Sequence, residues 1–227
     1  MNPIRLLAVL LLAVLFQFAQ AAGLADISNS EASSGLKEAL IKGADFAVSN
    51  LGKDNGFLGN PKVRIPLPDS LRTAEKAMRA VGMGKQADEL VATMNHAAEQ
   101  AVAQAKPILM DSIRKMTLKD AKDILAGGDD AVTQYFRRSS SDQLVQKFMP
   151  IVRGATRKVQ LADKYNRFAG KAANFGLISK EDADLDTYVT HKAMDGLFLM
   201  IAEEERNIRQ NPVGAGSALL KKVFGAL

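Results

Sequence analysis

The sequence predicts an all-α protein: a multi-helix bundle crossed by one extended, proline-containing strap at about residues 57–68. Two observations support this fold class. Apolar residues recur at helical spacing over nearly the whole chain, and an alternating, strand-like pattern appears only once. We therefore expect helices to form the core, with the strap lying across them.

Residues 1–21 have the pattern of a cleaved secretory signal peptide. Arg5 is their only charge, residues 6–18 are apolar apart from Gln17, and small residues mark a cleavage site at 19–21. The apolar run is shorter than the ~20 residues of a spanning helix, so we expect no retained transmembrane helix. The expected product is an exported, periplasmic protein with a single helical domain at residues 22–227.

Composition excludes several kinds of site. The chain has no cysteine, which rules out a lipoprotein anchor, thiol nucleophiles and thiolate zinc sites. Its net charge is +5, and +4 without Arg5. A mildly basic exported protein meets anionic lipids and envelope polymers before it meets DNA, so we expect such partners and no nucleic acid.

The first predicted helix begins at a capping box made by Ser28 and Glu31 and continues to about residue 48. Glycines at 52 and 56 end it. Three prolines in the strap disfavour a helix there. A short helix should follow from residue 69 or 70 to about 82.

A narrow apolar seam then predicts one long helix from Lys85, with close helix packing at its alanines. The seam continues past Pro107, so we expect a kink at that proline without an end to the helix. The seam residues are Ala87, Val91, Met94, Ala98, Ala101, Ala105 and Ile108.

Two short helices should follow, one capped by Thr117 and Asp120 and one at about residues 130–138. The serines at 139–141 indicate a linker and a cap, which leads into a long helix over about 142–170, bent at Pro150. The last long helix, 186–210, is apolar on most sides and should be central. A short amphipathic tail ends the chain.

The stretch LDTYVTHKAMDGLFLMIAEEERNIRQNP at 185–212, with LLKKVFG at 219–225 and RIPLP in the strap, resembles a bacterial family catalogued as domain of unknown function 4197. The resemblance covers most of the mature chain. It implies a bacterial exported protein and brings no assigned activity.

Five basic residues on the predicted helix 142–170 lie within roughly 80° of arc at 100° per residue. We call this set the basic ridge: Arg153, Arg157, Lys164, Arg167 and Lys171. It is a candidate surface for an anionic lipid headgroup or polymer. The alternative is internal pairing, because residues 181–206 carry eight acids against two basic residues.

Asp195 interrupts the most apolar helix, and a buried carboxylate needs a cationic or hydrogen-bonding partner. Arg64 on the strap is the candidate partner. The two residues would form either part of a ligand pocket or a buried structural pair that holds the strap.

The sequence thus predicts a non-enzymatic protein that binds a lipid-like or anionic envelope component through the basic ridge or a pocket under the strap. We expect no catalytic residues, no metal and no cofactor, because no catalytic, phosphate-loop or metal-ligand motif is present. The alternative is a structural or partner-binding module, such as a homodimer, paired through the alanine seam or the tail.

Overall fold

The protein is described from a computed structural model that covers residues 28–82, 84–128, 130–159, 162–163, 165–166, 183–211 and 217–224. These residues form helices, turns and the strap, with no strand among them, which confirms the all-α prediction. The predicted signal peptide lies outside the described residues. The elements are α2 (Asn29–Leu51), η2 (Asp69–Leu71), α3 (Arg72–Ala80), α4 (Gly84–Val102), α5 (Lys106–Lys115), α6 (Leu118–Leu125), α7 (Ala131–Thr156), α9 (Leu185–Gln210) and α10 (Ala218–Phe224).

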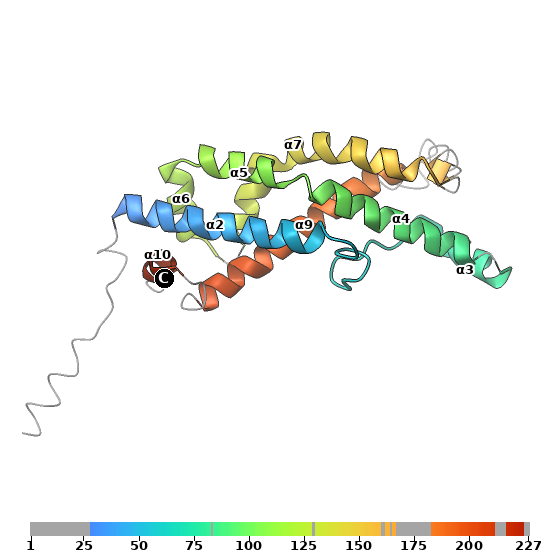
Figure 1. The fold of residues 1–227 in the computed structure, drawn as a ribbon, viewed down its shortest axis with the longest axis horizontal. Coiled ribbons are helices and arrows are strands. Elements are labelled where there is room, and N and C mark those ends of the chain that lie inside the picture. The colour runs from blue at the N-terminus through green and yellow to red at the C-terminus, as the bar shows by residue number, and fades with distance from the viewer. Residues whose placement is uncertain are drawn as a thin grey trace, which may run out of the picture.

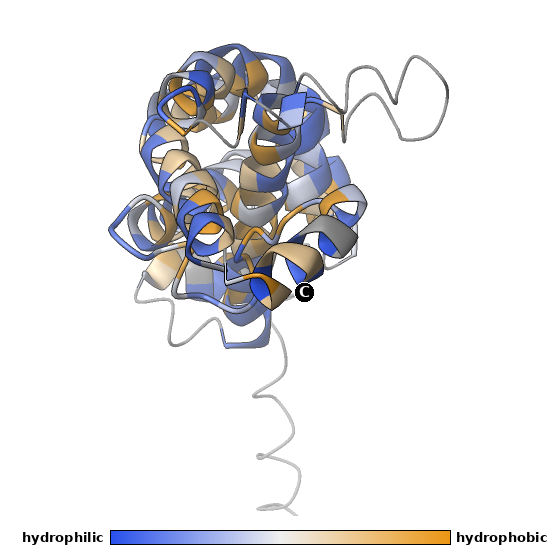
Figure 2. Ribbon diagram, turned by 90° about the vertical axis from the view of Figure 1, so that its right-hand side faces the viewer, coloured by the Kyte–Doolittle hydropathy of each residue, from blue (hydrophilic) through white to orange (hydrophobic). Residues whose placement is uncertain are grey.

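Helix α9 is the centre of the bundle, as its apolar composition predicts. It packs against α7, α2 and α4, and it crosses the molecule obliquely in Figure 1. Leu197 and Phe198 are fully buried on it, within one continuous apolar core. Viewed along the long axis, the helices carry both hydrophobic and hydrophilic residues along their length (Figure 2).

Helix α2 begins at the predicted capping box, in which Ser28 and Glu31 satisfy each other's backbone donors. Helix α10 docks beside it, as Figure 1 shows. Val223 is fully buried there, and Lys222 Nζ lies 2.8 Å from a carboxylate oxygen of Glu31. Part of the predicted amphipathic tail therefore packs against the chain itself.

The alanine seam is buried inside the molecule, but it does not lie on one long helix. Helix α4 ends at Val102, and α5 begins at Lys106 with Pro107 in its first turn. The predicted kink is therefore wrong. Proline is favoured in a first helical turn, where no backbone donor is needed, and the turn at 103–105 keeps Ala105 in the core.

Helix α7 runs without a break from Ala131 to Thr156, through the serines predicted to form a linker. The hydroxyl of Ser140 donates to the carbonyl of Phe136, so this serine is satisfied inside a helix and caps nothing. The helix also ends at Thr156, well before the predicted residue 170. Pro150 lies within it, as predicted.

Residues 57–59 and 61–63 form turns, so the prediction that the whole strap is extended is wrong. The predicted alternation of buried and exposed residues holds from Val63 to Leu67 and ends there, because Pro68 is buried. Val63, Ile65 and Leu67 are buried, whereas Arg64 and Pro66 are exposed. Asn95 of α4 accepts the Ile65 N–H at 2.8 Å and donates to the Ile65 carbonyl at 2.9 Å. The hydroxyl of Tyr188 on α9 donates to the Pro66 carbonyl at 3.1 Å. The strap is thus held between α4 and α9.

None of the helices in the described part of the chain is long and apolar enough to cross a membrane.

Candidate functional site

A cavity of about 590 Å³ lies between the strap and α9, and we call it the strap cavity. Four basic side chains line it, together with the carboxylates of Asp69 and Asp195. Pro66, Tyr188 and Leu199 add apolar surface. The basic residues are Lys62, Arg64, Arg72 and Lys192.

Two of these cations are neutralised by carboxylates. Lys62 Nζ lies 2.8 Å from Glu203 of α9, and Arg72 Nε lies 2.8 Å from Asp69. Both ion pairs join exposed or half-buried side chains, so they are weak and open to competition.

The other two cations, Arg64 and Lys192, form no ion pair with any carboxylate in the described part of the chain. The ammonium group of Lys192 lies 5.7 Å from the ring centre of Tyr188, which orients it by a cation–π contact. Arg64 acts at longer range on Asp88: the pKa of that carboxyl lies below its ordinary value, chiefly through the hydrogen bond from Arg79, with a smaller contribution from Arg64. Arg64 of the strap and Lys192 of α9 therefore line the cavity with positive charges that no ion pair in the described part of the chain neutralises.

The expected buried pair between Asp195 and Arg64 is wrong. The side chain of Asp195 is 55% exposed, and its carboxylate contacts Arg137 of α7 at 3.3 Å. The Arg137 guanidinium also stacks 4.7 Å above the Phe198 ring. Asp195 and Arg64 nevertheless line the same cavity, so of the two alternatives only the pocket arrangement is compatible with their positions.

Gly196 sets the position of the strap on α9. A Cβ at this position would lie 2.6 Å from a ring carbon of Phe57 and 3.3 Å from Cβ of Val63. Only a glycine therefore lets the strap approach the helix this closely.

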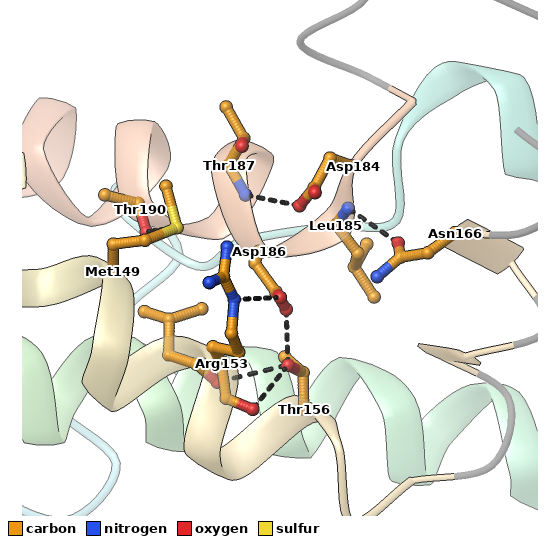
Figure 3. A network of polar contacts seen from close by, with 10 residues as sticks. Met149, Arg153, Thr156, Asn166, Asp184, Leu185, Asp186, Thr187 and Thr190 are labelled. Carbon is orange, nitrogen blue, oxygen red and sulfur yellow. Dashed lines mark hydrogen bonds and ion pairs between the residues drawn. The ribbon is translucent and has the colours of Figure 1, made fainter. Parts of the chain in front are cut away.

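The basic ridge is described only in part, since Lys164, Arg167 and Lys171 lie outside the described residues. Arg153 is paired inside the molecule: its Nε lies 3.3 Å from the buried carboxylate of Asp186, which also accepts the Thr156 hydroxyl (Figure 3). Arg157 is exposed and follows the end of α7. For Arg153 the internal-pairing alternative is therefore correct.

The Asp186 network fixes the start of α9 against the end of α7. Asp184 caps α9 by accepting the Thr187 N–H at 3.0 Å, and Asn166 accepts the Leu185 N–H at 2.8 Å (Figure 3). Because Asp186 is 6% exposed, its charge needs the donors that Arg153 and Thr156 supply, and we assign the network a structural role.

A second hollow, of about 460 Å³, was not anticipated from the sequence. His96 and the buried Glu99 of α4 line it, with Nδ1 of His96 2.7 Å from a Glu99 oxygen. We call it the histidine hollow. The i,i+3 spacing of His96 and Glu99 is a signal that the sequence offers for their contact. The other hydrogen bonds to Glu99 come from Phe57 and Leu58, about 40 residues earlier in the chain, and no local pattern predicts them. In the described part of the chain, no group of three or more histidine or acidic side chains is arranged to hold a metal.

Over residues 26–225, the sequence matches the family described as Protein of unknown function (DUF4197). No curated protein and no solved structure is significantly similar to the chain.

Proposed function

We propose that this chain, which belongs to the family described as Protein of unknown function (DUF4197), is a binding protein of the cell envelope that holds an anionic, partly apolar ligand in the strap cavity. One observation carries the proposal. Arg64 and Lys192 come from different elements, line one cavity and form no ion pair with a carboxylate in the described part of the chain. A shared anion would neutralise both.

The dimensions and walls of the cavity indicate the ligand class. A volume of about 590 Å³ suits a small molecule or a lipid headgroup with part of its chain. Leu199 is 37% exposed beside the cations, so an apolar group next to the anion would cover it. A phosphate or carboxylate with an attached apolar part matches both features.

The strap cavity is favoured over the basic ridge as the binding surface. Arg153 is already neutralised by Asp186, and breaking that pair would leave a buried carboxylate uncompensated. Arg64 and Lys192 do not neutralise a buried carboxylate in this way, so a ligand can bind them without disrupting the fold.

The partner-binding alternative loses the surface that would support it best. The alanines of the seam are buried by the chain itself, and Val223 of the tail is fully buried. These buried side chains are therefore not available to a second copy in the folded bundle, which supports ligand binding over pairing through them.

Export is the part of the proposal that rests on residues 1–21. Cleavage after Ala21 would deliver the domain to the periplasm without an anchor. Terminal sequencing of the protein from a periplasmic fraction should begin at Ala22. A cytoplasmic product that keeps Met1 or residues 2–21 would contradict this location.

Calorimetric titration with a soluble probe, inorganic pyrophosphate, tests the cavity. The wild type should bind one equivalent, with an affinity that falls as salt rises. The double variant Arg64→Glu/Lys192→Glu should lose this binding, because both cations become repulsive.

A matched control is Arg114→Glu/Lys119→Glu, which makes the same change of charge at exposed positions on α5 and α6. The control should bind like the wild type. Equal losses in the two double variants would show only a general effect of net charge and would refute a specific site.

A further inference from the structure

The histidine hollow lies at the start of the strap and is separate from the strap cavity. Its lining residues are Gly52, Asp54, Asn55, His96, Glu99 and Gln100. No lysine or arginine is among them, whereas four line the strap cavity. The two concave sites therefore select for different charge, and the anion proposal makes no use of this one.

Glu99 is held as a rigid, buried carboxylate. Only 3% of the residue is exposed, and one of its oxygens accepts the backbone N–H groups of Phe57 and Leu58 at 2.9 and 3.1 Å. These two hydrogen bonds hold the turn at Phe57 and Leu58 against α4. The second oxygen, which is directed to His96, is not needed for that structural task.

The contact with Glu99 fixes the chemistry of the imidazole. An ionised carboxylate only accepts hydrogen bonds, so the proton of a neutral His96 must sit on Nδ1, and Nε2 keeps a free lone pair. The side chain of His96 is 45% exposed and lines the hollow. A carboxylate that orients a histidine in this way is the arrangement by which enzymes present a general base.

We propose that His96 is a general base for the hydrolysis of a carboxylic ester without negative charge in the histidine hollow, with Glu99 as its positioning residue. The substrate carries no negative charge, because Asp54 and Glu99 would repel an anion. Asn55 and Gln100 line the same hollow, and in this proposal their side-chain amides are the N–H donors for the developing oxyanion.

The reaction consumes one water molecule. Nε2 takes a proton from water as its oxygen bonds to the ester carbon, giving a tetrahedral adduct. The bond from that carbon to the alkoxy oxygen then breaks, and the departing oxygen takes the proton back from Nε2. A carboxylic acid and an alcohol leave, and His96 returns to its neutral form.

Hydrolysis of p-nitrophenyl acetate by the full chain tests the proposal. The wild type should exceed the rate of an equal concentration of free imidazole, and His96→Gln should lower the rate about 100-fold. His191→Gln removes the other histidine of the chain and should keep the activity. A wild type no faster than imidazole, or equal losses in both variants, would overturn the assignment.

A second measurement separates positioning from folding. Glu99→Gln should lower the rate about ten-fold and shift the pH–rate profile, while circular dichroism stays unchanged. Nitrogen-15 NMR of the imidazole should show a proton on Nδ1 in the wild type and a mixture of tautomers in Glu99→Gln. The Nε2–H tautomer in the wild type would contradict the geometry.

Discussion

At the scale of single residues, Gly196 decides how closely the strap approaches α9. Any larger residue there meets the ring of Phe57, which is fully buried in the core. The position of the strap sets the width of the strap cavity, so this glycine shapes the proposed binding site without touching a ligand.

Gly196→Ala should therefore destabilise the fold by about 1–3 kcal/mol, because the added methyl group forces Phe57 or the strap to shift. Urea unfolding followed by circular dichroism measures the change. The matched control is Gly154→Ala on α7, where a Cβ meets nothing within 4 Å. That variant should be about 0.5–1 kcal/mol more stable than the wild type. Equal effects at the two glycines would contradict the packing argument.

Single residues also show where inference from the sequence stops. The pattern of α9 correctly predicted a buried helix, but it did not identify Asp195 as one of its exposed positions, because the partner Arg137 lies on another helix. The contacts of Glu99 are even less predictable from the sequence. Its donors at Phe57 and Leu58 are 42 and 41 residues away in the chain, and no local pattern contains that contact.

At the scale of elements, the strap depends on polar anchors as well as on apolar burial. Asn95 is fully buried and satisfies both backbone groups of Ile65, and its amide also donates to the Val91 carbonyl. The backbone hydrogen bonds within the strap, donated by Asn60, Val63 and Arg64, lie in its turns, so at Ile65 the contacts with Asn95 replace those of a helix or sheet.

Asn95→Ala should cost about 2–4 kcal/mol, since it leaves the N–H and the carbonyl of Ile65 buried without partners. Asn207→Ala, at an exposed position on α9, is the control and should stay within about 0.5 kcal/mol of the wild type. Denaturant midpoints of the three proteins check both values. Similar stability for Asn95→Ala and the wild type would mean that the strap is not anchored there.

The ion pair between Lys222 of α10 and Glu31 of α2 should stabilise the fold in a pH-dependent way. The pKa of Glu31 is lowered from 4.5 to about 2, first by the hydrogen bond from Lys222 and then by those from Ser28. A depressed pKa means that the carboxylate stabilises the fold above pH 4.5 and that this stabilisation is lost as the pH falls through about 2.

Consequently the difference in melting temperature between the wild type and Glu31→Gln should be largest at neutral pH and should shrink towards zero at about pH 2. Glu89→Gln, an exposed change on α4, controls for the loss of one carboxylate. A difference that is constant over this range would show that Lys222 and Ser28 do not act on the charge of Glu31.

Elements with a strong local signal were predicted well. The capping boxes at Ser28 and Thr117 fixed two helix starts, and both occur where they were expected. Pro107 and the serines at 139–141 were misassigned because each is compatible with two states: a proline kinks a helix or begins one, and a serine caps a helix or bonds to its preceding turn. Tertiary packing selects between them.

At the scale of the whole molecule, one apolar core extends through the described helices and encloses the alanine seam. The predicted fold class followed from periodicity, which reports burial directly. The proposed site did not, because a cavity arises from the placement of the strap against α9, and helical spacing within one element carries no information about that placement.

Enclosure of the seam predicts a monomer. Light scattering coupled to size-exclusion chromatography should give the mass of one chain, at most 24.4 kDa. A stable dimer would show that the chain pairs through a surface other than the seam, and mapping that surface would then take priority over the cavity.

The central claim is that the strap cavity holds an anionic ligand. Native mass spectrometry of the protein purified gently from its own envelope, beside the same sample denatured, tests it most directly. We expect an extra mass that disappears on denaturation, is absent from Arg64→Glu/Lys192→Glu and is present in Arg114→Glu/Lys119→Glu. A bare chain in the wild type, or a ligand that both double variants retain, would contradict the claim.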